Sequence, residues 1–128
     1  MSDEQKDKVR VRGYRDLLVW QKGMRLVKGV YDLTGHFPAD ERFGLVSQMR
    51  RAAVSVPSNI AEGQARKSTG EFVQFISNAE GSAAELDTQL QLSVDLGFSS
   101  ISQAADLFES ISELKKMLNG LRRKLLKH

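Results

Sequence analysis

The 128-residue sequence contains no cysteine, only two histidines and only two prolines. A chain without cysteine has no disulfide, no thiolate zinc site and no cysteine nucleophile. His36 and His128 have no companion at metal-ligand spacing, and no Glu is followed by His three residues later, as it is in di-metal helical bundles. Phosphate-loop and nucleophile-elbow motifs are also missing. We therefore expect no metal, no cofactor and no catalytic residue, and hence a protein that is not an enzyme.

Long apolar segments are missing as well. No run approaches the roughly 18 apolar residues that a membrane span needs, and the first six residues are polar, unlike a signal peptide. These features, together with the lack of cysteine, indicate a cytoplasmic protein. A length of 128 residues fits one domain with a substantial core.

Basic and acidic residues are segregated along the chain, although the formal net charge is only +3. Residues 71–114 contain eight acidic residues and no Lys or Arg, whereas residues 115–128 contain six basic residues and no acidic one. One molecule therefore carries a positive and a negative surface. Such surfaces can bind a polyanion, or they can bind each other on neighbouring subunits.

The first 15 residues have almost no apolar content before Tyr14. This composition predicts a flexible basic arm over residues 1–15, followed by a folded domain over residues 16–128. Arginines of the arm and basic residues of the last segment are the candidates for contacts with nucleic-acid phosphates. They are Arg10, Arg12, Arg15, Arg122, Arg123, Lys124 and Lys127.

The first helix is predicted to start after Asp16, which is a good N-cap residue. Its apolar residues recur at steps of three and four, so we expect them, including both aromatic residues, to face the core. A role for these aromatic rings in base stacking is the alternative. The row comprises Leu17, Trp20, Met24, Val27 and Tyr31.

The second helix is predicted from about Asp40 to Gly63, with Pro57 inside it. Proline removes a backbone donor and crowds the carbonyl four residues earlier, so we expect a kink over residues 53–57. Two short helices, the second starting at Pro57, are the alternative. Phe37, in the preceding turn, is expected to close one end of the core.

Two capping patterns predict the starts of the last two helices, Ser68 with Glu71 and Ser100 with Gln103. Gly97 is a suitable stop between them.

The last helix has a strict heptad seam. Four helices joined by short turns predict an all-α fold, an up-down-up-down antiparallel four-helix bundle. The seam comprises Ala104, Leu107, Ile111, Leu114, Leu118, Leu121 and Leu125.

A polar row runs beside the apolar residues of the second helix, and a similar row follows the third. Antiparallel packing with a short connection would place Arg51 opposite Glu85 and Ser55 opposite Gly81. We interpret the rows as a structural contact between helices, because buried polar groups need partners. A ligand groove is the alternative. The structural row comprises Gln48, Arg51, Ser55, Asn59, Glu62 and Glu85.

Several segments resemble the four-helix-bundle proteins encoded in intervening sequences of bacterial 23S ribosomal RNA genes, also called the S23 ribosomal protein family. The most specific segments are Arg-Arg-Ala at residues 50–52 and Asn-Ile-Ala-Glu-Gly at residues 59–63. Residues 14–22, 37–38, 41, the whole stretch 48–63, 71–72 and 81–86 also match in order and spacing, so the resemblance covers roughly residues 14–98.

The resemblance implies a bundle that assembles into a ring, with a homopentamer as the expected form. Related accessory variability proteins of diversity-generating retroelements bind nucleic acid and a reverse transcriptase. We therefore expect a non-enzymatic, ring-forming bundle that associates with RNA or DNA through its basic surfaces. An oligomeric protein-binding scaffold with no nucleic-acid role is the alternative.

Overall fold

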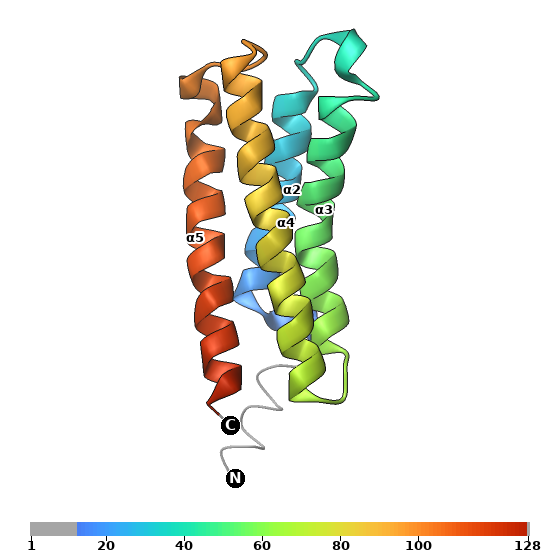
Figure 1. The fold of residues 1–128 in the computed structure, drawn as a ribbon, viewed down its shortest axis with the longest axis vertical. Coiled ribbons are helices and arrows are strands. Elements are labelled where there is room, and N and C mark those ends of the chain that lie inside the picture. Colours follow the sequence, from blue (N-terminus) through green and yellow to red (C-terminus); the bar gives the residue numbers. More distant parts are fainter. Residues whose placement is uncertain (1–12, 128) are drawn as a thin grey trace.

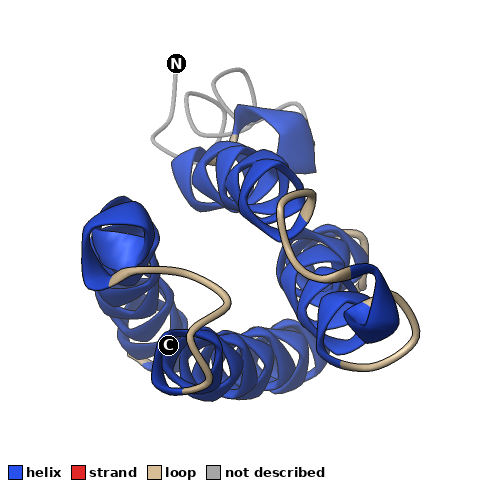
Figure 2. Cartoon of the chain, turned by 90° about the horizontal axis from the view of Figure 1, so that it is seen from above, coloured by secondary structure: helices blue, strands red, loops and turns tan. Residues whose placement is uncertain are grey.

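The computed structural model describes residues 13–127 and contains four α-helices and no strand within that range. Successive helices run in opposite directions, and seen from above they lie in chain order around the core (Figures 1 and 2). Each helix contacts the next, and α2 also contacts α5. The predicted four-helix bundle is thus confirmed. Its elements are η1 (Tyr14–Asp16), α2 (Leu18–Thr34), η2 (Ala39–Glu41), α3 (Leu45–Gln64), α4 (Thr69–Asp95) and α5 (Ile101–Leu126).

Serine side chains cap the N-termini of α4 and α5, as predicted. The Ser68 hydroxyl accepts from the Glu71 amide at 3.1 Å. At α5 the Ser100 hydroxyl accepts from the Gln103 amide at 3.0 Å, and the Gln103 side chain accepts from the Ser100 amide at 2.8 Å, which completes a capping box. Beyond α4, Gly97 has a φ of +79°, the left-handed conformation that favours glycine and ends a helix.

The start of α2 differs from the prediction by one residue. Leu17 is the N-cap, and Asp16 lies in η1 instead. Tyr14, also in η1, places its ring centre 5.3 Å from that of Trp20, so residues before Asp16 pack against the folded domain. Residues 1–12, most of the predicted arm, lie outside the described residues.

The predicted core-facing row of α2 is only partly correct: Leu17, Trp20 and Val27 pack against the core but are only partly buried. Met24 and Tyr31 are 46% and 44% exposed, whereas Leu26 and Val30 are almost fully buried. Gly23 explains the difference, because a Cβ at this position would lie 3.3 Å from the ring of Pro57. The closest approach of α2 to α3 therefore passes through the row that contains Gly23. The observed row is Val19, Gly23, Leu26, Val30 and Thr34.

The second predicted helix is one continuous helix, α3, with Pro57 inside it. The alternative of two short helices is therefore wrong. The start of α3 lies at Leu45, five residues later than predicted, because Gly44 adopts a non-helical conformation before it. The Glu41 carboxylate accepts from the Leu45 amide at 3.3 Å and so satisfies one of the free donors of the helix start.

The core runs through all four helices, and Phe37 closes one end of it. Phe37 is 8% exposed, and its ring centre lies 5.7 Å from that of Phe98, which follows α4. The heptad seam of α5 is confirmed: its first five residues are buried and the last two are partly buried. Among the helices described, none is long and apolar enough to cross a membrane.

Candidate functional site

The two polar rows meet between α3 and α4. The hydroxyls of Ser55 and Ser82 lie 2.8 Å apart. Asn59 donates to the backbone carbonyl of Ser55 at 2.8 Å and to its hydroxyl at 2.9 Å. The sequence predicted that Ser55 faces Gly81, but Ser55 contacts the next residue, Ser82. A Cβ on Gly81 would have open space around it. One pair of hydroxyl groups therefore links the two helices here, while the Asn59 amide bonds within α3.

Arg51 and Glu85 share one small cavity, of about 340 Å³, between α3 and α4. They lie on the same side of the bundle, as predicted, but no ion pair joins them within residues 13–127. Glu85 instead accepts from Gln89 at 3.2 Å. Gln48 lines the same cavity, and Glu62 lies 3.9 Å from Arg66, a long and exposed pair.

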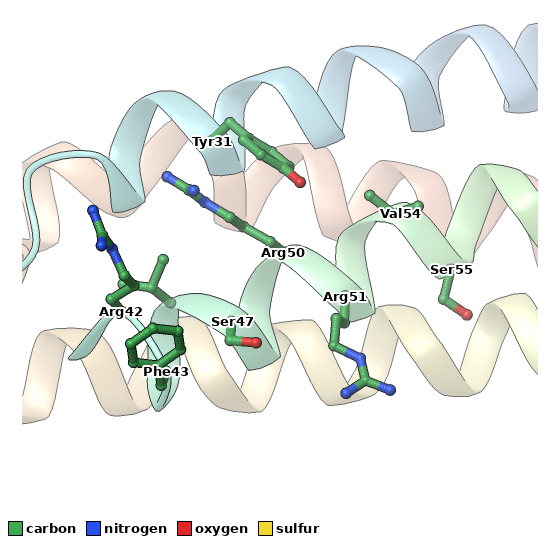
Figure 3. Close-up of a pocket in the computed structure, with 9 residues that line it drawn as sticks. Tyr31, Arg42, Phe43, Ser47, Arg50, Arg51, Val54 and Ser55 are labelled. Carbon is green, nitrogen blue, oxygen red and sulfur yellow. The ribbon is translucent and has the colours of Figure 1, made fainter.

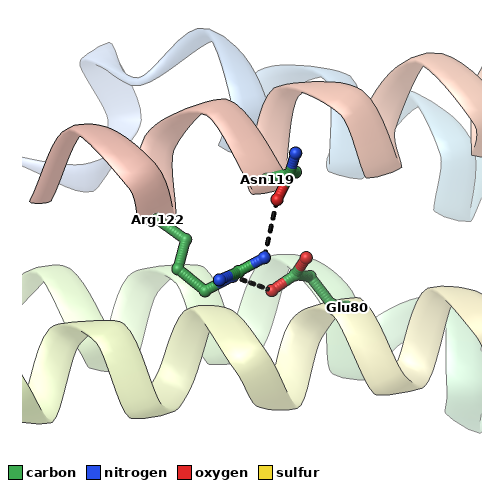
Figure 4. Close-up of polar contacts among 3 residues, drawn as sticks. All are labelled: Glu80, Asn119 and Arg122. Carbon is green, nitrogen blue, oxygen red and sulfur yellow. Dashed lines mark hydrogen bonds and ion pairs between the residues drawn. The ribbon is translucent and has the colours of Figure 1, made fainter. Parts of the chain in front are cut away.

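The predicted phosphate-binding residues do not all have free side chains. Arg122 donates to Glu80 at 2.9 Å and to Asn119 at 2.6 Å, so its guanidinium is held inside the α4–α5 contact (Figure 4). The guanidinium of Arg15 lies 5.5 Å from the ring centre of Trp20, close enough for a cation–π contact. Arg10 and Arg12 lie outside the described residues.

One end of the bundle gathers exposed basic side chains. The start of α2, the α3–α4 turn and the end of α5 all lie toward this end, in the lower part of Figure 1. Arg66 and Lys67, in the α3–α4 turn, were not predicted as phosphate contacts, because only the bundle topology brings this turn to the same end of the molecule as the end of α5. We define this basic end as Arg15, Arg66, Lys67, Arg123, Lys124 and Lys127, all exposed.

The acidic residues of the stretch 71–114 occupy α4 and the first half of α5. Glu80 is paired with Arg122, and Glu113 lies 2.6 Å from Lys22 of α2. The hydrogen bond and charge of Lys22 lower the pKa of Glu113. The other six make no ion pair within residues 13–127; they are Glu71, Glu85, Asp87, Asp95, Asp106 and Glu109.

A larger cavity, of about 600 Å³, opens along the outer side of α2 and α3 (Figure 3). It contains two exposed aromatic residues, Tyr31 and Phe43; Phe43 precedes α3 and is 89% exposed. The guanidinium of Arg50 covers the Tyr31 ring at 4.4 Å and donates to the hydroxyl of Thr34 at 2.9 Å. We call this the aromatic groove; its lining is Tyr31, Arg42, Phe43, Val46, Ser47, Arg50, Arg51, Val54 and Ser55.

The aromatic groove has basic residues and no acidic residue in its lining. Arg42 and Arg51 make no ion pair or side-chain hydrogen bond with any other residue in the range 13–127. Two further cavities adjoin the groove: the small cavity that contains Glu85 shares Arg51 and Ser55 with it, and another along α2 and α3 shares Val54. Sequence reasoning missed this surface, because it placed Tyr31 in the core and Phe43 inside a helix.

No group of three or more His, Asp and Glu residues in the described part of the chain could hold a metal ion.

Comparison with known proteins places this fold in a family. The model of the 23S rRNA-intervening sequence protein family matches residues 15–120. A solved structure from the S23 ribosomal protein family, a protein of unknown function from Bacteroides thetaiotaomicron VPI-5482, matches with a TM-score of 0.74 and 19% sequence identity. The match covers 82% of this chain and 98% of that one. A comparison with curated proteins found no match. The chain therefore belongs to the 23S rRNA-intervening sequence protein family.

Proposed function

We propose that this protein is a non-enzymatic four-helix bundle that assembles into a ring, with five subunits as the expected number, and binds RNA or DNA through its basic end. The observation that carries the nucleic-acid part is the gathering of six exposed basic side chains from three separate segments at one end of the bundle. Within residues 13–127, only Arg66 of these six is in an ion pair, and that pair is long. Free cations so placed can neutralise successive phosphates of a nucleic-acid backbone.

Binding of this kind is largely independent of base sequence. Each neutralised phosphate releases counterions, so the logarithm of the affinity falls by about 0.7 to 0.9 for each log unit of salt. Because the chain has no cysteine, it suits a reducing compartment. We therefore place the protein in the cytoplasm, where RNA and DNA are both accessible.

The test is a fluorescence-polarisation titration of the full chain with labelled single-stranded RNA and duplex DNA at several salt concentrations. We expect binding that weakens with salt, and a double variant, R123Q/K124Q, whose salt slope is shallower by about 1.4 to 1.8 because two phosphate contacts are lost. The matched control is R25Q/K28Q, which removes the same charge from exposed positions in the middle of α2. An equal loss of slope in both variants would contradict a specific role for the basic end.

A protein-binding scaffold is the second candidate. The observation that favours it is the set of six acidic residues on α4 and α5 that make no ion pair within the described range 13–127, and that a basic surface of another subunit could neutralise. Absence of salt-dependent binding to every RNA and DNA probe would leave the scaffold as the remaining function.

A further inference from the structure

We infer that the aromatic groove is the docking site for a second copy of this chain, and that the α4–α5 turn of that copy occupies it. The inference rests on the proposed ring and names the two different surfaces that would join its subunits. We define the turn surface by Leu92, Asp95, Leu96 and Ile101, which end α4 and begin α5.

Exposed apolar side chains mark both surfaces. In the groove, Tyr31, Phe43 and Val54 are 44%, 89% and 41% exposed. Apolar side chains exposed around one groove can be buried by a partner, and this burial is favourable. Aromatic and arginine side chains also form the most strongly contributing contacts of protein interfaces. The turn surface has exposed side chains of the same character: Leu92 at 45%, Leu96 at 59% and Ile101 at 73%.

The charges of the two surfaces are opposite. The groove carries Arg42 and Arg51, neither of which has an ion-pair partner within residues 13–127. The turn surface carries Asp95, whose described side-chain contact is a hydrogen bond from Gln91 at 2.9 Å. No Lys or Arg occurs between residues 71 and 114. Electrostatic complementarity therefore favours the pairing of unlike surfaces and opposes the contact of two grooves.

The turn surface and the Phe43 end of the groove lie at the same end of the bundle, and the groove extends from there to Ser55, near the middle of α3. The α2–α3 connection, which bears Phe43, and the α4–α5 turn are both at the top of Figure 1, opposite the basic end. Subunits related by rotation about an axis parallel to the helices meet at equal heights. A contact between two different surfaces at one height therefore allows a closed ring, whereas surfaces at opposite ends would shift each subunit along the axis.

The decisive experiment compares the absolute masses of two variants, alone and mixed, by light scattering. R42E/F43E alters the groove, and D95K/L96K alters the turn surface; all four positions are exposed, so both variants are expected to fold. We expect the wild type at several times 14.3 kDa and each variant alone at 14.3 kDa. The mixture should give a dimer of about twice the mass of one chain, because each variant keeps the surface that the other has lost.

The control is R25E, which reverses an exposed charge on α2. Arg25 lines neither the aromatic groove nor the cavity that shares Val54 with it, so R25E should leave the wild-type mass unchanged. A wild-type oligomer that R42E/F43E does not dissociate would overturn the inference while leaving the ring intact. A mixture that stays monomeric would also overturn it. Loss of oligonucleotide binding in an R42E/F43E variant that remains oligomeric would assign the groove to nucleic acid instead. A monomeric wild type would overturn both the ring and its surfaces.

Discussion

Gly63 and Gly81 lie in neighbouring helices and have opposite surroundings. A Cβ at Gly63, near the end of α3, would lie 2.7 Å from the Cβ of Phe75 and 2.9 Å from a ring carbon of Phe72. A Cβ at Gly81, in the middle of α4, would have no atom of another part of the chain within 4 Å. The close approach of α3 to α4 therefore occurs at the end of the helix pair, beside the connecting turn.

Substitution of each glycine by alanine should change stability in opposite directions. Gly63→Ala should lower the free energy of unfolding by about 1 to 3 kcal/mol, because the aromatic side chains of α4 must move. Gly81→Ala should raise the free energy of unfolding by about 0.5 to 1 kcal/mol, because alanine has less conformational freedom to lose in a helix. Urea denaturation of the two variants measures both changes. A destabilised Gly81→Ala variant would show that another surface covers this position, since the chain itself leaves it open.

At the scale of helices, the first and last elements of the bundle are joined by an ion pair. Lys22 of α2 lies 2.6 Å from Glu113 of α5, and its hydrogen bond and charge lower the pKa of that carboxyl group. Lys116 also lowers this pKa through its charge, and Glu109 does so through a hydrogen bond. Because the pKa of Glu113 is lowered in the folded state, its ion pair with Lys22 stabilises the folded protein at pH values above the pKa of Glu113 in the unfolded chain. This stabilisation is lost as the pH falls through the folded-state pKa.

Lys22→Gln should therefore raise the pH at which Glu113 titrates, as followed by the NMR shift of its carboxyl carbon. The difference in unfolding temperature between wild type and variant should shrink as the pH falls through that range, because a protonated Glu113 has little to gain from Lys22. Lys28→Gln, which removes an exposed lysine of the same helix that has no described ion pair, is the control. An unchanged titration of Glu113 in Lys22→Gln would exclude the ion pair in solution.

The sequence predicted α5 better than α2, and the reason is physical. In α5 the apolar residues form one heptad row, so one face alone can be buried. In α2 two adjacent rows are apolar, and the pattern does not say which one faces the core. The choice depends on Gly23, whose small size lets Pro57 of α3 approach. That contact between distant residues cannot be read from the spacing within one helix.

The candidate surfaces show the same limit. The basic residues of the C-terminal segment were predicted because they are neighbours in the sequence. The engagement of Arg122 by Glu80, 42 residues away, could not be predicted, nor could the placement of the α3–α4 turn at the same end of the bundle as the end of α5. The aromatic groove was hidden because Phe43 lies outside any helix, and Tyr31 belongs to the α2 row that the core leaves partly exposed.

At the scale of the whole molecule, the bundle has different ends. The basic end lies at one extreme of the long axis, and the groove and the turn surface lie toward the other (Figure 1). Rotation about a ring axis does not change the height of any atom along that axis. A ring joined by the groove and the turn surface would therefore hold all its basic ends at one level, on one face of the assembly.

Such a ring should bind long nucleic acids more tightly than short ones, because a long strand can contact several basic ends at once. We expect the wild type to bind a long single-stranded oligonucleotide more tightly than one that a single basic end can cover. R42E/F43E, which leaves the basic end intact but is expected to be monomeric, should lose most of this length dependence and retain the weaker affinity for the short strand. Polarisation titrations of both proteins at one fixed salt concentration measure the effect, with R25E as the charge-reversal control. Equal length dependence in a monomeric variant would mean that one subunit already spans the long strand, and that the ring does not gather the basic ends for binding.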